Sequence, residues 1–290
     1  MKTTHIFLTT ILIASIGLFT TSCSKEDGCT DPKATNYNPE ADNEDGSCTY
    51  PAAVEPATSS KITFNFTHNF DGALIDNSTS NQFDYITENE DTLNITLLRY
   101  LVSNIRLYKA NGDSVMINGY NLVDVINTAG TATGMTYATT VEVPFDTYTG
   151  VSFIFGFDEA DNTTNIYTDL NAVNWNWPDM LGGGYHFMQM NGNYMDNNVS
   201  SLYNYHLGTA KVSTGVFEQN YFKADLAGIT LNKEHVTMEI KMDIAEWYKN
   251  PNKWDLTIYN TVLMPNYTAQ KLMQANGASV FSLGTVTQND

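Results

Sequence analysis

The sequence predicts an all-β protein: an antiparallel β-sandwich with short helical insertions, preceded by a small disulfide-closed N-terminal module. Apolar and polar residues alternate over several short segments, which is the pattern of strands with one buried face. Gly, Asn and Pro separate these segments, as they do in β-sandwiches. Helix signals are weak and are confined to about residues 245–249 and 269–275.

Composition narrows the class further. The chain of 290 residues has 32 Asp and Glu against 14 Lys and Arg, a formal net charge of −18. Nucleic-acid binding needs clustered Lys and Arg, so this charge balance argues against it. With 42% hydrophobic and 12% aromatic residues, the chain also has too much apolar content for a disordered protein.

The first residues predict export. Lys2 precedes an apolar run over residues 6–19, and small residues lead to Cys23, so residues 1–22 are expected to be a lipoprotein signal peptide. A lipid on Cys23 would anchor the chain to a membrane. The alternatives are an uncleaved anchor or a plain signal. Residues 24–27, Ser-Lys-Glu-Asp, resemble the surface-export signal of Bacteroidota lipoproteins, which implies an outer-membrane lipoprotein facing the periplasm or the cell surface.

Residues 23–50 form an acidic module. Two Cys in an exported protein most simply pair, so a Cys29–Cys48 disulfide is expected. The segment resembles the Cys-Thr-Asp-Pro…Asp-Gly-Ser-Cys module of secreted Bacteroidota proteins. Its oxygen-bearing side chains suit Ca²⁺, and an acidic spacer without metal is the alternative. The calcium candidates are Asp31, Asn36, Asn38, Asp42 and Asp45. Residues 51–60 have the Pro, Ala and Ser content of a linker.

Strands account for most of the main domain, residues 61–290. Residues 62–70 alternate Ile, Phe, Phe, His and Phe with polar residues, and Asp71-Gly72 then predicts a turn. The apolar run at 97–108 ends at Ala-Asn-Gly-Asp, a hairpin signal. Later alternations at 141–145, 151–157 and 236–244 predict three more strands.

Catalytic motifs are missing or weak. The sequence has no Gly-x-Ser-x-Gly, His-Glu-x-x-His or P-loop motif, and no carboxylate pair stands out as acid and base. We therefore expect a protein that is not an enzyme.

Histidine is scarce and more informative. His68 shares a face with Ile62, Phe64, Phe66 and Phe70 and is expected to point inward. Strict alternation would put His186 on one face with Met188 and Met190, and His206 ends another expected strand. Imidazole and thioether together suit a soft ion such as Cu(I), although a single His is more often structural.

Four blocks resemble the MbnP-like family over about residues 61–285. These are residues 62–74, residues 98–107, Trp-Pro-Asp-Met-Leu-Gly-Gly-Gly-Tyr-His-Phe-Met-Gln-Met at 177–190, and Tyr-His-Leu-Gly at 205–208. The resemblance implies an exported β protein associated with copper and paired with a di-haem peroxidase-like partner. Related copper proteins bind the metal through two His beside a Trp that is oxidised to kynurenine.

The resemblance also suggests site residues. His68 and His206 lie in His-bearing blocks and are the favoured copper pair, with His186 as third candidate. Where the family often has Trp after Thr-His-Asn, this chain has Phe70, so Trp175 and Trp177 are the remaining candidates for oxidation.

Two hypotheses compete. The first is a lipoprotein that binds a copper ion through inward-facing His, for copper acquisition or handover. The second is a non-enzymatic cell-surface module that binds glycan or protein through Trp175, Trp177 and neighbouring Tyr and Asn, with structural His.

Overall fold

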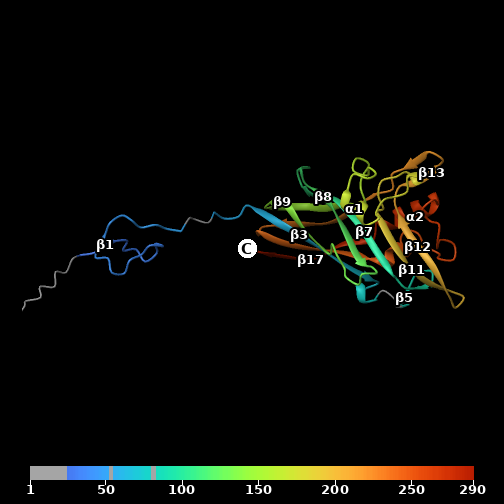
Figure 1. Cartoon of the computed structure of the whole chain (residues 1–290), viewed down its shortest axis with the longest axis horizontal. Helices are drawn as coiled ribbons and strands as arrows, with labels where there is room; N and C mark the ends of the chain where they lie inside the picture. Colours follow the sequence, from blue (N-terminus) through green and yellow to red (C-terminus); the bar gives the residue numbers. More distant parts are fainter. Residues whose placement is uncertain (1–24, 52–54, 80–82) are drawn as a thin grey trace, which may run out of the picture. The chain divides into compact units, whose positions relative to one another are not determined.

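The computed structural model describes residues 25–51, 55–79 and 83–290 (Figure 1). The signal peptide and Cys23, which the sequence predicts to be lipidated, lie outside the described residues. The chain divides into two compact units, Met1–Pro56 and Ala57–Asp290. Among the described residues, no helix has the length and apolar character needed to span a membrane.

The N-terminal unit is a small looped module. Its strands β1 (Asp27–Gly28) and β2 (Asn43–Glu44) pair in parallel. The expected disulfide between Cys29 and Cys48 is confirmed. Because the module has almost no apolar residues for a core, this bond is its main constraint, contributing about 3 kcal/mol for a loop of this size.

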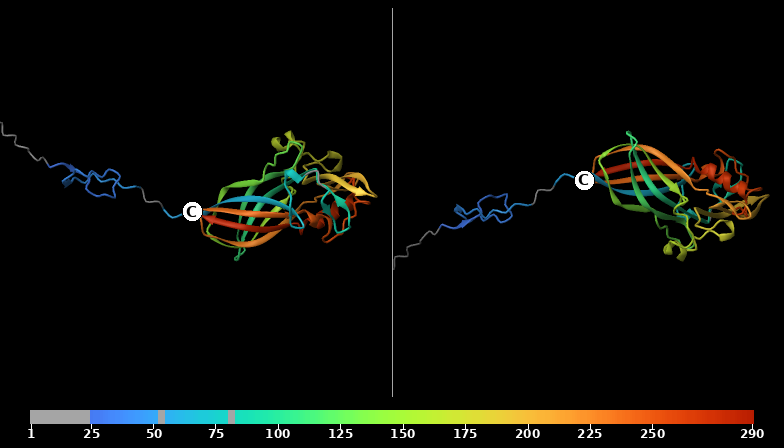
Figure 2. Two further views of the ribbon diagram at one scale, coloured as in Figure 1. Left: turned by 90° about the horizontal axis from the view of Figure 1, so that it is seen from below. Right: turned by 90° about the horizontal axis from the view of Figure 1, so that it is seen from above.

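The larger unit is built mainly from two large sheets, with a separate two-stranded sheet beside them, and Figure 2 shows it from opposite sides. One sheet contains eight strands: β5 (Tyr85–Ile86), β6 (Thr92–Leu93), β7 (Leu97–Lys109), β8 (Ser114–Ile126), β10 (Asp146–Phe155), β11 (Met188–Asp196), β12 (Val199–Leu207) and β15 (Phe222–Leu231). The other contains five: β3 (Ser59–Phe70), β4 (Ala73–Leu74), β9 (Thr136–Pro144), β16 (His235–Asp243) and β17 (Phe281–Asn289).

The all-β prediction is confirmed, and alternation explains the clearest strands. In β3 nearly every second side chain is buried, from Ile62 to Phe70, and β16 follows the same rule. One pairing departs from a purely antiparallel sandwich, because β3 and β16 run parallel. They lie about 170 residues apart in the chain, so no hairpin dictates their relative direction.

Buried apolar residues form two clusters on opposite faces of the eight-stranded sheet. The main core contains residues from both sheets, so it marks what we call the inner face. A smaller cluster consists of Leu101, Phe157, Leu170, Trp175 and Tyr185. Leu101 is adjacent to Tyr100 in β7, and Tyr100 belongs to the main core. Since successive side chains in a strand point to opposite faces, the smaller cluster marks the outer face.

Short elements complete the fold. The expected helix near 269–275 is confirmed as α2 (Tyr267–Gly277), whose first turn is capped by the Asn266 side chain accepting from the Ala269 N–H. The segment near 245–249 is a 3-10 helix, η3 (Ile244–Tyr248). The remaining elements are η1 (Asn77–Thr79), α1 (Thr168–Ala172), η2 (Asp179–Leu181), β13 (Ala210–Ser213) and β14 (Val216–Glu218).

Candidate metal centre

His68 lies in the main core, as its position in β3 predicts. It is 2% exposed, and its Nε2 lies 2.9 Å from the hydroxyl of Tyr100 on β7. Its Nδ1 is buried without a hydrogen-bonding partner among the described residues. The contact with Tyr100 therefore places the His68 ring on the inner face of the eight-stranded sheet.

His206 lies on the opposite face of that sheet. Its neighbours in β12, Tyr205 and Leu207, belong to the main core, so the alternating position of His206 points outward. Its Nε2 lies 2.7 Å from Oδ1 of Asn191 on the adjacent strand β11. The structure therefore does not bring together His68 and His206, the pair that the sequence favoured.

His186 is the residue that lies beside His206. The centres of the two imidazoles are 5.4 Å apart and their planes are inclined by 77°. Two imidazoles bound to one ion through metal–nitrogen bonds of about 2.0 Å have ring centres roughly 5–6 Å apart. The observed spacing is thus suited to a shared ion.

The expectation that His186 shares a face with Met188 is wrong. Strand β11 begins only at Met188, and Phe187 and Met188 both pack in the main core. The alternation is interrupted just before the strand, so His186 turns to the outer face, where its ring contacts His206.

Hydrogen bonds determine the tautomer of each ring. Nδ1 of His186 lies 3.1 Å from the carbonyl oxygen of Trp175, which can only accept, so Nδ1 carries the proton. Nε2 of His206 faces the amide oxygen of Asn191 and carries the proton for the same reason. The lone pairs available to a metal are therefore those of His186 Nε2 and His206 Nδ1. Metal-binding His commonly has this arrangement, with the second nitrogen donating to an oxygen.

Two buried indoles flank His186. The Trp177 ring meets it edge-on, with centres 4.9 Å apart, and the Trp175 ring lies 5.6 Å away. Trp177 Nε1 donates to the Leu181 carbonyl, whereas Trp175 Nε1 is buried without a partner among the described residues. Both indoles are at most 1% exposed. They are consequently not available as the surface that the glycan-binding or protein-binding alternative requires.

Burial keeps the imidazoles neutral. It lowers the pKa of His186 to about 3, with a further contribution from the neighbouring His206, and it lowers the pKa of His206 to about 4. The Arg99 guanidinium also disfavours a charge on His186, and it lies 4.9 Å from the centre of the Trp175 ring. Both nitrogens therefore keep their lone pairs at neutral pH, without competition from protons.

The donor set is small and uncharged. Among the described residues, no third His, Cys, Asp or Glu joins His186 and His206 in a cluster of potential ligands. Two neutral imidazole nitrogens enclosed by aromatic rings suit a copper ion better than a hard cation such as Mg²⁺ or Ca²⁺, which prefers oxygen ligands. The residues present therefore fit copper.

Sequence reasoning missed Arg99 and Asn191, which support the pair. Arg99 donates to the Val173 carbonyl and pairs with Asp124 at 3.4 Å, so it is tied to the outer face. Asn191 is two residues beyond Gln189, the partner of His206 across the β11–β12 pair. Only the strand register shows these relationships, and nothing in the sequence pattern reveals the register.

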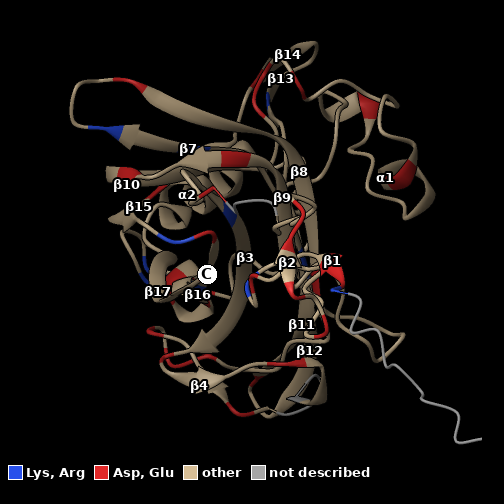
Figure 3. Ribbon diagram, turned by 90° about the vertical axis from the view of Figure 1, so that its left-hand side faces the viewer, with Lys and Arg blue, Asp and Glu red and all other residues tan. Residues whose placement is uncertain are grey.

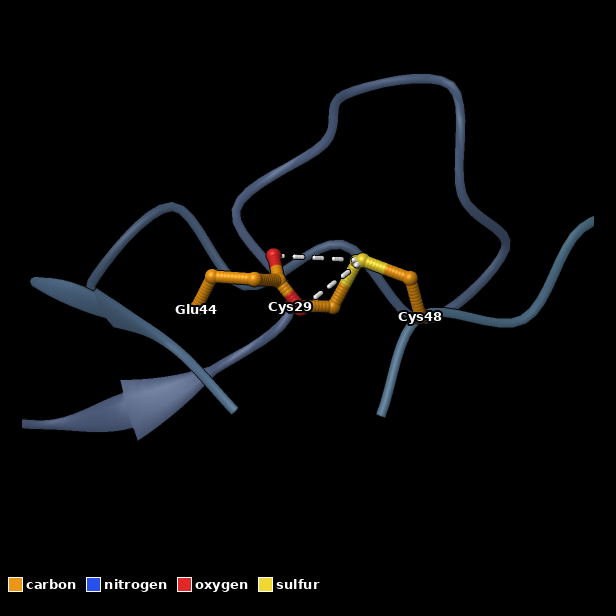
Figure 4. Close-up of side chains that lie close together, drawn as sticks. All are labelled: Cys29, Glu44 and Cys48. Carbon is orange, nitrogen blue, oxygen red and sulfur yellow. Dashed lines mark hydrogen bonds between the residues drawn. A yellow bond between two sulfur atoms is a disulfide. The ribbon is translucent and has the colours of Figure 1, made fainter. Parts of the chain in front are cut away.

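The N-terminal module offers a second group of potential ligands, Cys29, Glu44 and Cys48 (Figure 4). The sulfurs form the disulfide, so neither is a thiolate, and the 3.4 Å approaches of Cys48 Sγ to the Glu44 carboxylate are contacts without a proton. Glu44 instead accepts from the N–H and hydroxyl of Thr30. This group has no vacant soft donor for a metal.

Most of the calcium candidates already accept hydrogen bonds within the module. Side-chain oxygens of Asp31, Asn38 and Asp45 accept from backbone N–H groups two residues on, whereas Asn36 accepts from the Thr49 N–H and Asp31 also from the Tyr50 hydroxyl. Among the described residues, Asp31, Asp42 and Asp45 do not assemble into a group of three carboxylates. Calcium binding by this module stays a prediction.

Comparison with known proteins gives one family. The family model described as MbnP matches residues 59–266. Among solved structures, MbnP from Methylosinus trichosporium superposes with a TM-score of 0.53 at 13% identity, covering 79% of this chain and 99% of that chain. A search of curated proteins found no match.

Proposed function

Because this chain belongs to the MbnP family, we propose that it is an exported lipoprotein that binds one copper ion through His186 and His206 for acquisition or handover. The observation that carries this proposal is the adjacency of two neutral imidazoles, His186 buried and His206 half-buried, whose tautomers leave one lone pair each for a metal. The family resemblance supports copper as the ion. Copper is here the cargo, and the protein holds it without chemical change.

The surroundings of the pair support binding of a soft, weakly hydrated ion. The indoles of Trp175 and Trp177 limit access of water to His186. The carbonyl of Trp175 and the amide of Asn191 orient the two rings before a metal arrives, so little rotamer freedom is lost on binding. Since both donors are neutral, the positive charge of Arg99 favours the lower charge of Cu(I) over Cu(II).

Export, membrane attachment and a partner protein are parts of the same proposal. The signal-like residues 1–22 and Cys23 support a lipid anchor in the outer membrane, with the protein facing the periplasm or the cell surface. The family resemblance supports a di-haem peroxidase-like partner, and Trp175 and Trp177 beside His186 are the indoles on which it would act. We expect no catalytic activity of the chain itself.

Copper analysis of matched variants tests the proposal. Protein is loaded with excess Cu(I), desalted and analysed for metal, with thermal melting used to verify folding. We expect one copper ion per chain in the wild type and in His68→Phe, and almost none in the double variant His186→Ala with His206→Ala. Equal copper in the double variant and the wild type would overturn the proposal.

A milder variant guards against misfolding of the double variant. Asn191→Leu keeps both imidazoles but removes the oxygen that orients His206. Changes of this kind weaken metal binding by about 10–100-fold. Unchanged affinity in a competition titration against a copper chelator would contradict the role given to this side chain.

A further inference from the structure

The outer face of the eight-stranded sheet has a hollow that shares no residue with the histidine pair. Its volume is about 220 Å³. The lining side chains are aromatic, amide or acidic, and none is Lys or Arg; the lining residues are Asn104, Asn118, Gly119, Tyr120, Phe157, Asp161 and Tyr167. Since ligand sites combine an apolar wall with a few placed polar groups, this composition identifies the hollow as a candidate for a small ligand.

The half-buried rings of Tyr120 and Tyr167 form one wall of the hollow, and the buried ring of Phe157 packs behind them. Phe157 and Tyr167 stack with centres 4.7 Å apart, and the ring of Tyr120 meets both at steep angles, at 5.3 and 4.7 Å. The Tyr120 hydroxyl donates to Asp169 at 2.6 Å, which holds this ring in place. The electron-rich faces of such rings attract cations.

Carboxylates surround this wall. Asp161 lines the hollow, and Asn104 Nδ2 donates to Asp161 at 2.8 Å and to Asp158 at 3.2 Å. Asn104 has a φ of 49°, a left-handed conformation that Asn adopts more readily than most residues and that fits its place at a β-bulge. It is the point at which the register of β7 shifts against its neighbours.

Counter-charges are scarce in this part of the chain. Between Lys109 and Lys211 the sequence contains no Lys or Arg, and this stretch includes Tyr120, Phe157, Asp161 and Tyr167. Strand β7, which supplies Asn104, carries Arg106, whose guanidinium donates to the Ser114 hydroxyl. In Figure 3 the segment around α1 is marked by acidic residues only. Burial and the nearby Asp161 and Asp158 raise the pKa of Tyr167, which is consistent with a negative potential at the hollow.

We propose that this hollow binds a small organic cation with a methylated ammonium group, held against the half-buried rings of Tyr120 and Tyr167 and neutralised by Asp161. Such a cation loses little hydration on leaving water, and it gains both the quadrupole of the rings and the charge of the carboxylate. The volume admits a head group of this kind but not a large ligand, which needs about 300 Å³ or more. This site is independent of copper.

Calorimetric titration of the full chain with choline chloride tests the ligand class. The matched probes are 3,3-dimethylbutan-1-ol, which has the same shape without the charge, and glucose, at equal ionic strength. We expect choline to bind in the millimolar range and at least tenfold more tightly than either neutral probe. Equal binding of the neutral alcohol, preferential binding of glucose, or no binding of choline would each overturn the proposal.

Variants with matched controls test the residues. Asp161→Asn keeps the shape and an oxygen for Asn104 but removes the charge, so choline affinity is expected to fall at least threefold. The control Glu142→Gln makes the same change of charge on β9 and should leave the choline affinity within twofold of the wild-type value. Tyr167→Phe retains the ring and the affinity, whereas Tyr167→Leu loses binding. If Tyr167→Leu fails to fold, Asp161→Asn and Tyr167→Phe still test the proposal. Equal choline affinity of Asp161→Asn and the wild type would refute the assignment of Asp161 to the site.

Discussion

Mild acid is expected to destabilise the metal-free β domain because three histidines, two of them buried and His206 half-buried, are neutral in the folded protein. Burial lowers the pKa of His68 and of His186 to about 3, and that of His206 to about 4, all below the ordinary value of 6.5. The unfolded chain therefore takes up protons first as the pH falls. This contribution to stability is complete above pH 6.5 and is lost progressively as the pH falls toward the folded-state values.

The size of the effect follows from the number of groups. Each histidine costs up to about 1.4 kcal/mol of unfolding free energy for each pH unit below 6.5. Three such groups cost about 4 kcal/mol for each unit, or up to about 6 kcal/mol between pH 6.5 and 5. Most Asp and Glu titrate below this window, so the histidines dominate it.

Denaturant unfolding of metal-free protein, followed by Trp fluorescence at pH 7, 6 and 5, measures this effect. The slope of unfolding free energy against pH should fall by about a third in His68→Phe, which removes one of the three groups. Equal unfolding free energies at pH 7 and pH 5 would refute the reasoning. An unchanged slope in His68→Phe would refute the role assigned to this residue.

Three further predictions concern single features. Replacing Cys29 and Cys48 by Ser should lower the unfolding free energy of the N-terminal module by about 3 kcal/mol. Calorimetry should show the unfolding transition of the β domain at its original temperature. A shift of that transition would contradict the division into two separate units. Gly208→Ala would place a Cβ atom 2.5 Å from the Trp177 ring. We therefore expect thermal unfolding to show a loss of about 1–3 kcal/mol in unfolding free energy, together with weaker copper binding. Gly150→Ala, whose new Cβ would lie 3.6 Å from its nearest neighbour, is the tolerated control, and similar losses in both variants would argue against the close contact. His68→Phe should leave the Tyr100 hydroxyl unpaired and lower the unfolding free energy by about 1–3 kcal/mol. Adding Tyr100→Phe should recover part of this loss. Additive losses in the double-mutant cycle would contradict the hydrogen bond.

Alternation was sufficient to predict the strands with one buried face. Residues 62–70 and 236–244 both have period two, and both are strands with alternating burial. The same rule failed at His186, because it assumes that the strand already exists there. Strand β11 begins two residues later, and local propensity does not reveal that boundary.

The pairing of site residues depends on information that a sequence pattern lacks. Period two predicted that His68 points inward, and this is where it lies. It could not show that His206 lies on the opposite face of the eight-stranded sheet, because that depends on the register of β12 against β11. Trp175 and Trp177 reach His186 through a covering segment outside the sheet, so only the tertiary structure brings them to the site.

X-ray absorption at the copper edge of the protein loaded with one equivalent of Cu(I) tests the central claim most directly. We predict two nitrogen scatterers at about 2.0 Å, with the multiple scattering of imidazole rings and no sulfur ligand. The spectrum should be the same in His68→Phe and should be lost when His186 and His206 are replaced. A sulfur shell in the wild type, or a spectrum that depends on His68, would contradict the assignment of copper to His186 and His206.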